Sequence, residues 1–191
     1  MLTLILGGAR SGKSRYALQL AGAVTSGSSS PNLLFIATAT ACDAEMADRI
    51  RKHKADRDII WRTVEEPLDP AAVVRANPSA DVIVVDCITL LLSNHFMEVW
   101  SDEAERIDDV DLEGVNRAVK ELIDAAKTSP SSVILVANEL GLGLVPETAL
   151  GRVFRDTAGW ANQEIAAQAD QVVLMVAGIP VIVKGPGQGV R

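Results

Sequence analysis

The sequence predicts an α/β fold in which a mostly parallel β-sheet is flanked by helices. Five short runs of Val, Ile and Leu show no alternation with polar residues, which is typical of strands covered on both faces. Longer segments with helical periodicity separate these runs, so strand and helix alternate along the chain. A glycine-rich motif stands directly behind the first run, where a strand would give way to a helix.

The expected strands are the five apolar runs, at 2–6, 32–39, 81–86, 132–138 and 171–177. A further segment at 179–185 follows a Gly-Ile-Pro turn and is expected to add an edge strand. The expected helices lie between the runs, at 13–24, 43–57, 69–76, 88–96, 111–127 and 155–169. The serine-rich stretch at 25–32 is too short to separate two domains, so one nucleotide-binding domain spanning 1–191 is expected.

Composition narrows the classes of function. The chain carries 18 Lys and Arg against 25 Asp and Glu, and a net charge of −7 argues against general affinity for nucleic acid. No run of about 18 apolar residues occurs and the amino terminus lacks a signal-peptide pattern, so a cytoplasmic protein without a membrane span is expected. Cys42 and Cys87 lie beside apolar sequence and are expected to be buried small hydrophobic residues.

The motif GGARSGKS matches G-x-x-x-x-G-K-[ST] without a mismatch. Glycines let successive backbone N–H groups turn onto phosphate oxygens, and the following helix N-terminus adds a positive dipole end. The sequence therefore predicts a phosphate-binding loop, called the cradle below, formed by Gly7, Gly8, Ala9, Arg10, Ser11, Gly12, Lys13 and Ser14. Lys13 is expected to reach the β- and γ-phosphates, and the Ser14 hydroxyl to bind Mg²⁺. A glycine turn without a ligand is the alternative.

Asp86 ends the apolar run DVIVVD and is the expected companion of the cradle. A carboxylate at the end of a buried strand can hold Mg²⁺ or its water shell. The alternative role is that of a strand-end cap.

The segment RIRKHKADR at 49–57 holds five of the 18 Lys and Arg residues around one histidine. Arg49, His53 and Arg57 are spaced i, i+4, i+8 and would share one helical face. Nearby cations disfavour imidazolium, so His53 should stay neutral and able to attack phosphorus. From spacing alone, a solvated basic face with an incidental histidine is the preferred interpretation. The other histidine, His95, lies at an apolar helix end and is expected to be structural.

These stretches together resemble the bifunctional adenosylcobinamide kinase/adenosylcobinamide-phosphate guanylyltransferase family of cobalamin biosynthesis. The resemblance covers nearly the whole chain and rests on GGARSGKS, FIATATACDAEMADRIRKHKADR, WRTVEEP, VVDCITLLLSN and NELGLGLVPETALGRVFRDTAGWANQEIAAQAD. The run from DAEMADRI through HKADR to WRTVEEP is specific to the family, whereas the phosphate loop alone is not. The resemblance reverses the interpretation of His53.

The resemblance implies a RecA-like P-loop fold, assembly as a trimer, and two reactions. Adenosylcobinamide is phosphorylated with ATP or GTP; GMP is then transferred from GTP, through a guanylylated histidine, to give adenosylcobinamide-GDP and pyrophosphate. The histidine implied is His53. The nucleotide contacts implied are the cradle together with Ala37, Thr38, Ala39, Lys54, Ala55, Asp56, Arg57, Glu65 and Asp86. A carboxylate such as Glu65 can accept from the guanine N1–H and N2–H₂ edge, which would select GTP.

Two matching stretches add further candidate residues. Asn138 and Glu139 end a predicted strand on the expected nucleotide side of the sheet. Arg152 and Arg155 are either phosphate ligands or ordinary surface arginines at a helix start. Two other functions remain open at this point: a kinase with a single activity and His53 as a bystander, and a nucleotide-sensing module without catalysis.

Overall fold

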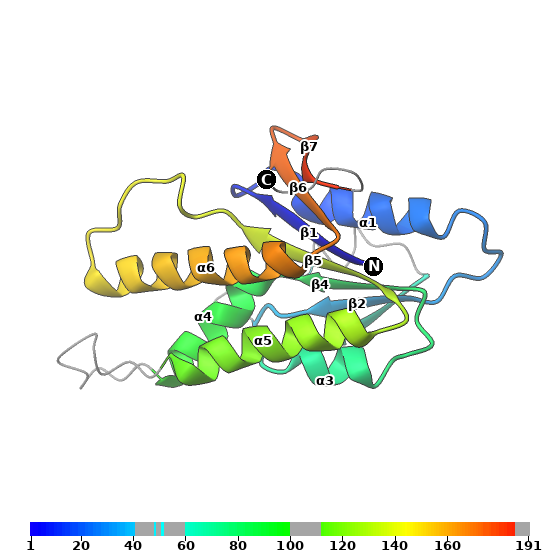
Figure 1. Cartoon of the computed structure of the whole chain (residues 1–191), viewed down its shortest axis with the longest axis horizontal. Helices are drawn as coiled ribbons and strands as arrows, with labels where there is room; N and C mark the ends of the chain where they lie inside the picture. The colour runs from blue at the N-terminus through cyan, green and yellow to red at the C-terminus, as the bar shows by residue number, and fades with distance from the viewer. Residues whose placement is uncertain (41–47, 49–50, 52–59, 100–111, 186–191) are drawn as a thin grey trace.

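The computed structural model describes residues 1–40, 48, 51, 60–99 and 112–185 (Figure 1). Its strands are β1 (Leu2–Gly7), β2 (Leu33–Ala37), β3 (Trp61–Glu65), β4 (Val82–Asp86), β5 (Ser132–Asn138), β6 (Gln171–Val176) and β7 (Ile179–Lys184). Its helices are α1 (Lys13–Val24), α3 (Pro70–Arg75), α4 (Ile88–Val99), α5 (Glu113–Thr128) and α6 (Ala149–Gln168).

The seven described strands form one sheet in the order β3-β2-β4-β5-β1-β6-β7. Every neighbouring pair from β3 to β6 is parallel, and only β7 runs antiparallel, at the edge beside β6. The predicted α/β fold with a mostly parallel sheet is confirmed, and so is the edge strand expected after residue 178. Strand β5 separates β1, which leads into the cradle, from β4, which ends in Asp86.

Both faces of the sheet are covered by helices, as Figure 1 shows. Leu4 and Leu135 pack with α3, α4, α5 and α6 on one face, whereas Ile5 and Ile134 pack with α1 on the other. All four side chains are at most 1% exposed. Burial on two faces explains why these strands carry no polar alternation in sequence. Burying one such side chain contributes about 1.5–3 kcal/mol to folding.

Two elements differ from the prediction. Strand β3 was not expected, because three of its residues, Arg62, Thr63 and Glu65, are exposed and break the apolar pattern. Such a strand is held at the sheet edge by its pairing with β2 rather than by a continuous hydrophobic surface. Helix α6 begins at Ala149, six residues before the predicted start at 155, because Thr148 caps it by accepting a hydrogen bond from the Gly151 N–H at 3.1 Å.

The helix expected at 43–57 lies outside the described residues, apart from Asp48 and Arg51, which are helical. Most of the acidic stretch at 98–114 also lies outside them. Within the part of the chain that the structure describes, no helix is long and apolar enough to cross a membrane.

Candidate active site

The carboxyl ends of the parallel strands form one edge of the sheet, and the described candidate residues meet there. Cross-strand pairing places Glu65 of β3 and Asp86 of β4 on either side of Ala37 of β2. At strand spacings of about 4.8 Å, the backbones of Glu65 and Asp86 are about 10 Å apart. Gly7 of β1 pairs with Asn138 of β5, and β5 pairs with β4 on the side away from β2. Ligands of open α/β sheets bind at this edge.

The cradle turns tightly between β1 and α1, and glycine is required at its first position. Gly7 has φ 152°, and a Cβ atom there would stand 2.7 Å from Ser11 Oγ and 2.8 Å from the Met175 carbonyl oxygen. The Ser11 carbonyl oxygen accepts from the Gly178 N–H at 3.0 Å, so the turn between β6 and β7 supports the cradle from behind. The backbone of the cradle is therefore fixed by the sheet on which it sits.

The N-terminus of α1 opens onto the cradle. Gly12 is its N-cap in a left-handed conformation; no described side chain caps the helix, and no acidic residue lies in its first turn. The positive end of the helix dipole is thus available to an anion. Lys13 is 8% exposed, and its Nζ donates to the Gly8 carbonyl oxygen at 2.7 Å. The cradle places a buried cation beside the exposed residues Gly8, Ala9 and Arg10, which suits a polyphosphate.

Asp86 is half-buried, and the turn behind it is held by Thr38. The Thr38 hydroxyl donates to the Cys87 carbonyl oxygen and accepts from the Cys87 N–H, both at 2.7 Å. The Thr38 N–H donates to the Asp86 carbonyl oxygen at 3.2 Å. Thr38 is fully buried, so its hydroxyl positions the chain around Asp86. The nucleotide contact implied at this residue stays a prediction.

Cys87 is a buried thiol and not a nucleophile of this site. Burial raises the pKa of Cys87 to about 12, and the charge of Asp86 acts in the same direction. The charge of Lys13 lowers the pKa of Cys87. The Lys13 ammonium and the Asp86 carboxylate therefore both lie close enough to the Cys87 thiol to act on it. Only a thiolate is a good nucleophile, and this thiol stays protonated at neutral pH. The predicted burial of Cys87 is confirmed, whereas Cys42 lies outside the described residues.

The oxygen donors at this edge fit a magnesium ion. The Ser14 hydroxyl lies in the first turn of α1, and the Asp86 carboxylate ends β4. Mg²⁺ is usually bound by one or two protein oxygens together with phosphate oxygens and water, rather than by a cage of side chains. No cluster of three or more His, Cys, Asp and Glu side chains able to hold a metal occurs among the described residues.

Asn138 and Glu139 continue β5 next to the cradle. The Glu139 N–H donates to the Gly7 carbonyl oxygen at 3.0 Å, which extends the pairing of β5 with β1 into the cradle. The Asn138 N–H donates to the buried Thr89 hydroxyl at 2.8 Å, and its carbonyl oxygen accepts from the buried Asn162 side chain at 3.1 Å. Sequence reasoning did not find Thr89 or Asn162, because these contacts join residues 49 and 24 positions apart.

The two arginines of α6 make contacts within the protein. Arg152 donates to the carbonyl oxygens of Pro146 and Glu147 at 3.1 and 2.7 Å, which ties the preceding loop to the first turn of the helix. Arg155 lies 3.6 Å from the Asp156 carboxylate. Arg152 lies in the first turn of α6 and Arg155 in the second, and the role of both as phosphate ligands stays a prediction.

His53 lies outside the described residues, together with Lys54, Ala55, Asp56 and Arg57. The described chain extends from the end of β2 to Thr40, so it leaves the sheet at the edge that carries Asp86 and Glu65. The other histidine, His95, places Nε2 2.9 Å from the Leu68 carbonyl oxygen, in agreement with its predicted structural role.

Comparison with known proteins identifies the family. Residues 3–183 match the family model described as cobinamide kinase / cobinamide phosphate guanyltransferase. The chain belongs to this family. The predicted membership and the predicted enzyme class, a bifunctional kinase and guanylyltransferase, are thereby confirmed.

Three curated relatives align over nearly their whole lengths. The bifunctional adenosylcobalamin biosynthesis protein CobU of Escherichia coli (strain K12) is 40% identical over 190 residues, which cover 96% of this chain and 100% of that protein. CobP of Pseudomonas aeruginosa is 44% identical over 186 residues, covering 97% and 98%. CobU of Salmonella typhimurium is 42% identical over 188 residues, covering 96% and 100%.

A solved structure resembles the fold alone. The flagellar accessory protein FlaH from Methanocaldococcus jannaschii aligns with a TM-score of 0.50 over 96% of this chain and 78% of that chain, at 16% sequence identity. The predicted RecA-like P-loop fold class is confirmed by this likeness together with the sheet order.

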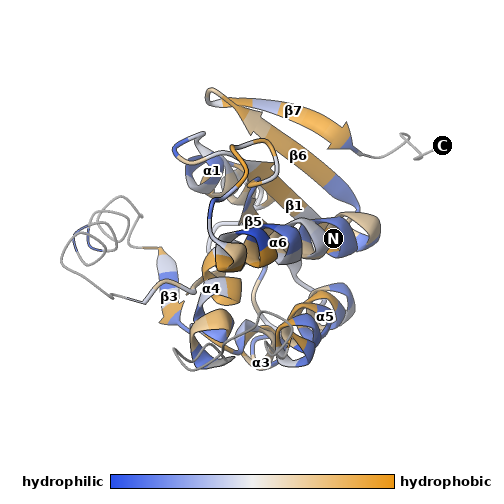
Figure 2. Cartoon of the chain, turned by 90° about the vertical axis from the view of Figure 1, so that its left-hand side faces the viewer, coloured by the Kyte–Doolittle hydropathy of each residue, from blue (hydrophilic) through white to orange (hydrophobic). Residues whose placement is uncertain are grey.

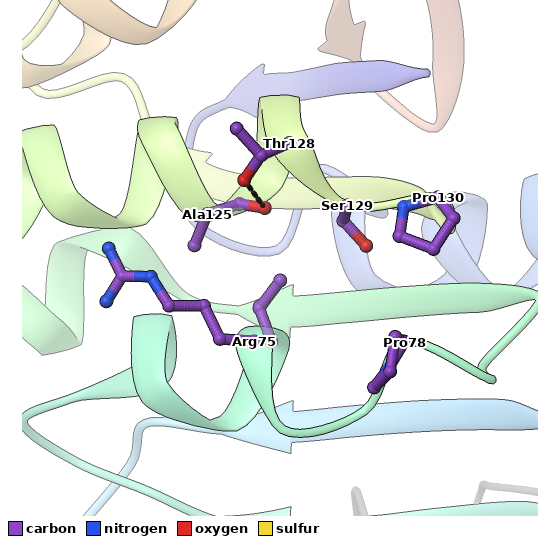
Figure 3. A pocket seen from close by; sticks show the side chains of 7 residues that line it. Arg75, Pro78, Ala125, Thr128, Ser129 and Pro130 are labelled. Carbon is purple, nitrogen blue, oxygen red and sulfur yellow. Dashed lines mark hydrogen bonds between the residues drawn. The ribbon is translucent and has the colours of Figure 1, made fainter.

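A hollow lies between α3 and α5 and the segments that follow these helices (Figure 3). It is lined by Val74, Arg75, Pro78, Ala125, Thr128, Ser129 and Pro130. Pro78 precedes β4 and Pro130 precedes β5, so the hollow lies at the amino ends of strands whose carboxyl ends face the cradle edge. Its one charged side chain, Arg75, donates to the Glu121 carbonyl oxygen at 3.2 Å.

Proposed function

We propose that this chain phosphorylates adenosylcobinamide with ATP or GTP and then transfers GMP from GTP to adenosylcobinamide phosphate through a guanylyl-His53 intermediate. The products are adenosylcobinamide-GDP and pyrophosphate, and the reactions belong to assembly of the cobalamin nucleotide loop. One nucleotide-binding domain spanning 1–191 carries both activities. The cradle supports this proposal most directly, because Lys13 and the N-terminus of α1 lie at the sheet edge that also carries Asp86. Family membership over residues 3–183 supports both reactions.

In the first reaction the aminopropanol hydroxyl oxygen of the corrinoid attacks the γ-phosphorus. The bond from the γ-phosphorus to the bridging oxygen breaks, the nucleoside diphosphate leaves with the bond electrons, and the hydroxyl proton passes to solvent. Negative charge spreads over the transferring phosphoryl oxygens, and Lys13 with the α1 N-terminus would stabilise it. Ser14 and Asp86 would hold the magnesium ion, which supplies further positive charge at the phosphates.

In the second reaction a neutral imidazole nitrogen of His53 attacks the α-phosphorus of GTP. A P–N bond forms, the α–β phosphoanhydride bond breaks, and pyrophosphate leaves. A phosphate oxygen of adenosylcobinamide phosphate then attacks the same phosphorus, the P–N bond breaks, and the imidazole is regenerated. The cations of 49–57 would keep His53 neutral before attack and would offset the phosphate charge during it.

The direct test is a product assay with purified protein. Incubation with adenosylcobinamide, Mg²⁺ and ATP should give adenosylcobinamide phosphate, and later addition of GTP should give adenosylcobinamide-GDP with one pyrophosphate per turnover. Adenosylcobinamide phosphate without subsequent GDP ester would support a kinase with one activity. Nucleotide binding without either product would support a sensing module.

Asp86→Asn should raise the magnesium concentration needed for half-maximal rate in both reactions. The amide keeps the shape of the side chain but removes its charge, and changes of this kind commonly cost about 10- to 100-fold in metal affinity. Asp81→Asn is the matched control, because Asp81 precedes the same strand at the opposite edge, where its Oδ2 accepts from the Asn32 N–H at 2.8 Å. Magnesium titrations that agree among wild type and both variants would assign Asp86 to strand capping.

Glu65→Gln should weaken guanylylation by GTP more than phosphorylation by ATP. The substitution replaces one acceptor oxygen by a donor that faces the guanine N1–H and N2–H₂ groups. One hydrogen bond is therefore lost, and the amide donor faces a guanine donor. Steady-state KM values for GTP and ATP measure the difference. Glu66→Gln is the control, since its remaining amide oxygen can still accept from Leu68 and Asp69. Equal losses with both nucleotides would show that Glu65 does not contact the base.

Assembly as a trimer forms part of the proposal. The edge strand β7 presents apolar side chains to solvent, and Figure 2 shows this strand coloured as hydrophobic at the margin of the sheet. Ile179, Val181, Ile182 and Val183 are between 46% and 65% exposed. An exposed apolar edge strand of this kind is typical of an interaction surface. Light scattering on the purified chain measures the oligomeric state.

The cytoplasmic location stays a prediction.

A further inference from the structure

Asn94 on α4 makes three polar contacts with loops at the cradle edge. Its Nδ2 lies 2.8 Å from the Thr38 carbonyl oxygen and 2.9 Å from the Pro67 carbonyl oxygen. Both partners only accept hydrogen bonds, so the atom between them is the amide nitrogen and both of its protons are used. The amide oxygen accepts from the Thr40 hydroxyl at 3.2 Å. One half-buried side chain therefore joins the loop after β2 to the loop after β3.

These two loops carry the groups that the proposed chemistry needs. Pro67 follows Glu65 by two residues, and Thr38 clasps the turn that follows Asp86. Near the sheet, the Glu66 N–H donates to the Ala37 carbonyl oxygen at 2.9 Å. Further along the two loops, the Asn94 amide makes the next hydrogen-bonded connection between them. Three other hydrogen bonds already hold Thr38 to the turn after Asp86. The Asn94 contact therefore fixes the loop that follows Glu65, and the Asp86 turn does not depend on it.

Hydrogen bonds within the loop after β3 restrict its movement, so a displacement of Pro67 should also displace Glu65. The Glu66 carboxylate accepts from the N–H groups of Leu68 and Asp69 at 3.0 and 2.9 Å. His95, the next residue on α4, contacts the Leu68 carbonyl oxygen. Two adjacent side chains of α4 therefore hold this loop against the helix.

We propose that Asn94 is a positioning residue that fixes Glu65 for recognition of the guanine base of GTP. The inference rests on the proposed function, in which Glu65 contacts the base. Asn94 acts through the backbone of both loops and needs no contact with the nucleotide. Its effect should therefore appear in the KM for GTP, and much less in kcat for phosphorylation by ATP.

The test is the isosteric substitution Asn94→Asp, which replaces the two donated hydrogen bonds by a carboxylate oxygen facing two carbonyl oxygens. The KM for GTP in guanylylation should rise by about tenfold, equivalent to about 1.4 kcal/mol, which is the scale of one hydrogen bond. The kcat for phosphorylation by ATP should change by less than about twofold.

Asn77→Asp is the matched control for lost stability. The Asn77 Nδ2 donates to the Val73 carbonyl oxygen at 2.7 Å, beside the amino ends of the strands. Its Oδ1 accepts from the Arg62 guanidinium, and an aspartate oxygen at this position can still accept from it, so only the donor is lost. This variant should lower the melting temperature without changing the KM for GTP. An equal rise of that KM in Asn77→Asp and Asn94→Asp would overturn the proposal, because the effect would then follow from stability alone.

The double variant with Glu65→Gln separates failure of this inference from failure of the proposed function. If Asn94 acts through Glu65, adding Asn94→Asp to Glu65→Gln should raise the KM for GTP little further. A Glu65→Gln variant with unchanged KM would contradict the proposed base contact itself. A Glu65→Gln variant with raised KM, beside an Asn94→Asp variant with unchanged KM or fully additive effects, would overturn only the positioning role.

Thr40→Val keeps the inference testable if Asn94→Asp does not fold. Thr40 is exposed, and its loss removes only the hydroxyl that orients the Asn94 amide. The KM for GTP should rise by about two- to threefold, less than the effect of losing the donor pair. An unchanged KM in a cooperatively folded Thr40→Val protein would overturn the proposal.

Discussion

Replacing Lys13 by alanine should slow the phosphorylation of adenosylcobinamide by about a hundredfold or more, equivalent to at least about 2.7 kcal/mol of lost transition-state stabilisation. The ammonium group lies at the first position of α1, where its charge adds to the positive end of the helix dipole. Charge that develops on the transferring phosphoryl group is stabilised most by a cation that is already fixed and shielded from water. Single-turnover rates with ATP at saturating magnesium measure the loss.

Two checks separate this effect from damage to the fold. Lys13 is buried and donates to the Gly8 carbonyl oxygen, so the variant should also melt at a lower temperature than wild type. Assays are therefore made well below that temperature. The control is Lys120→Ala, because Lys120 is exposed on α5. A wild-type phosphorylation rate in folded Lys13→Ala would contradict the assignment of the cradle.

His53→Ala should separate the two activities completely. The substitution removes the proposed nucleophile and leaves Gly7 to Ser14 intact, so phosphorylation of adenosylcobinamide should persist while transfer of GMP is lost. Label from α-³²P-GTP should no longer remain on the denatured protein. The reason is chemical: without the imidazole no P–N bond can form, whatever the affinity for GTP.

His95→Ala is the control for His53→Ala and removes the only other histidine of the chain. His95 contacts the Leu68 carbonyl oxygen in the loop that follows Glu65, so its loss should lower stability and raise the KM for GTP. At saturating GTP the labelled protein adduct should still form. A stable guanylyl-protein in His53→Ala would place the nucleophile elsewhere and leave the basic segment as a phosphate clamp.

The fold was predictable where strands are buried on both faces. Continuous apolar runs gave β1, β2, β4, β5 and β6, and helix α1 has the predicted bounds because the cradle marks its start. Strand β3 was missed because Arg62 and Thr63 are exposed at a sheet edge, where pairing with β2 outweighs a weak local pattern. The start of α6 was predicted too late because the cap at Thr148 stands outside the apolar periodicity.

The site was predictable only as far as its residues carry a local signal. The cradle has a motif, and Asp86 ends an apolar run, so both were visible without a structure. The supports of the site have no such signal. Thr38 meets Cys87 across 49 positions, and Asn94 meets Thr38 across 56. Contacts of this kind arise from the order of the strands, which the spacing of motifs does not encode.

Labelling of the wild-type protein with α-³²P-GTP tests the central claim most directly. After denaturation and removal of free nucleotide, the protein should retain label that is lost in acid and stable in alkali, as expected of a phosphoramidate. Proteolysis should place the label on the peptide that contains His53. Label that survives acid, that maps to a peptide without His53, or that never appears on the protein would contradict the guanylyl-histidine mechanism.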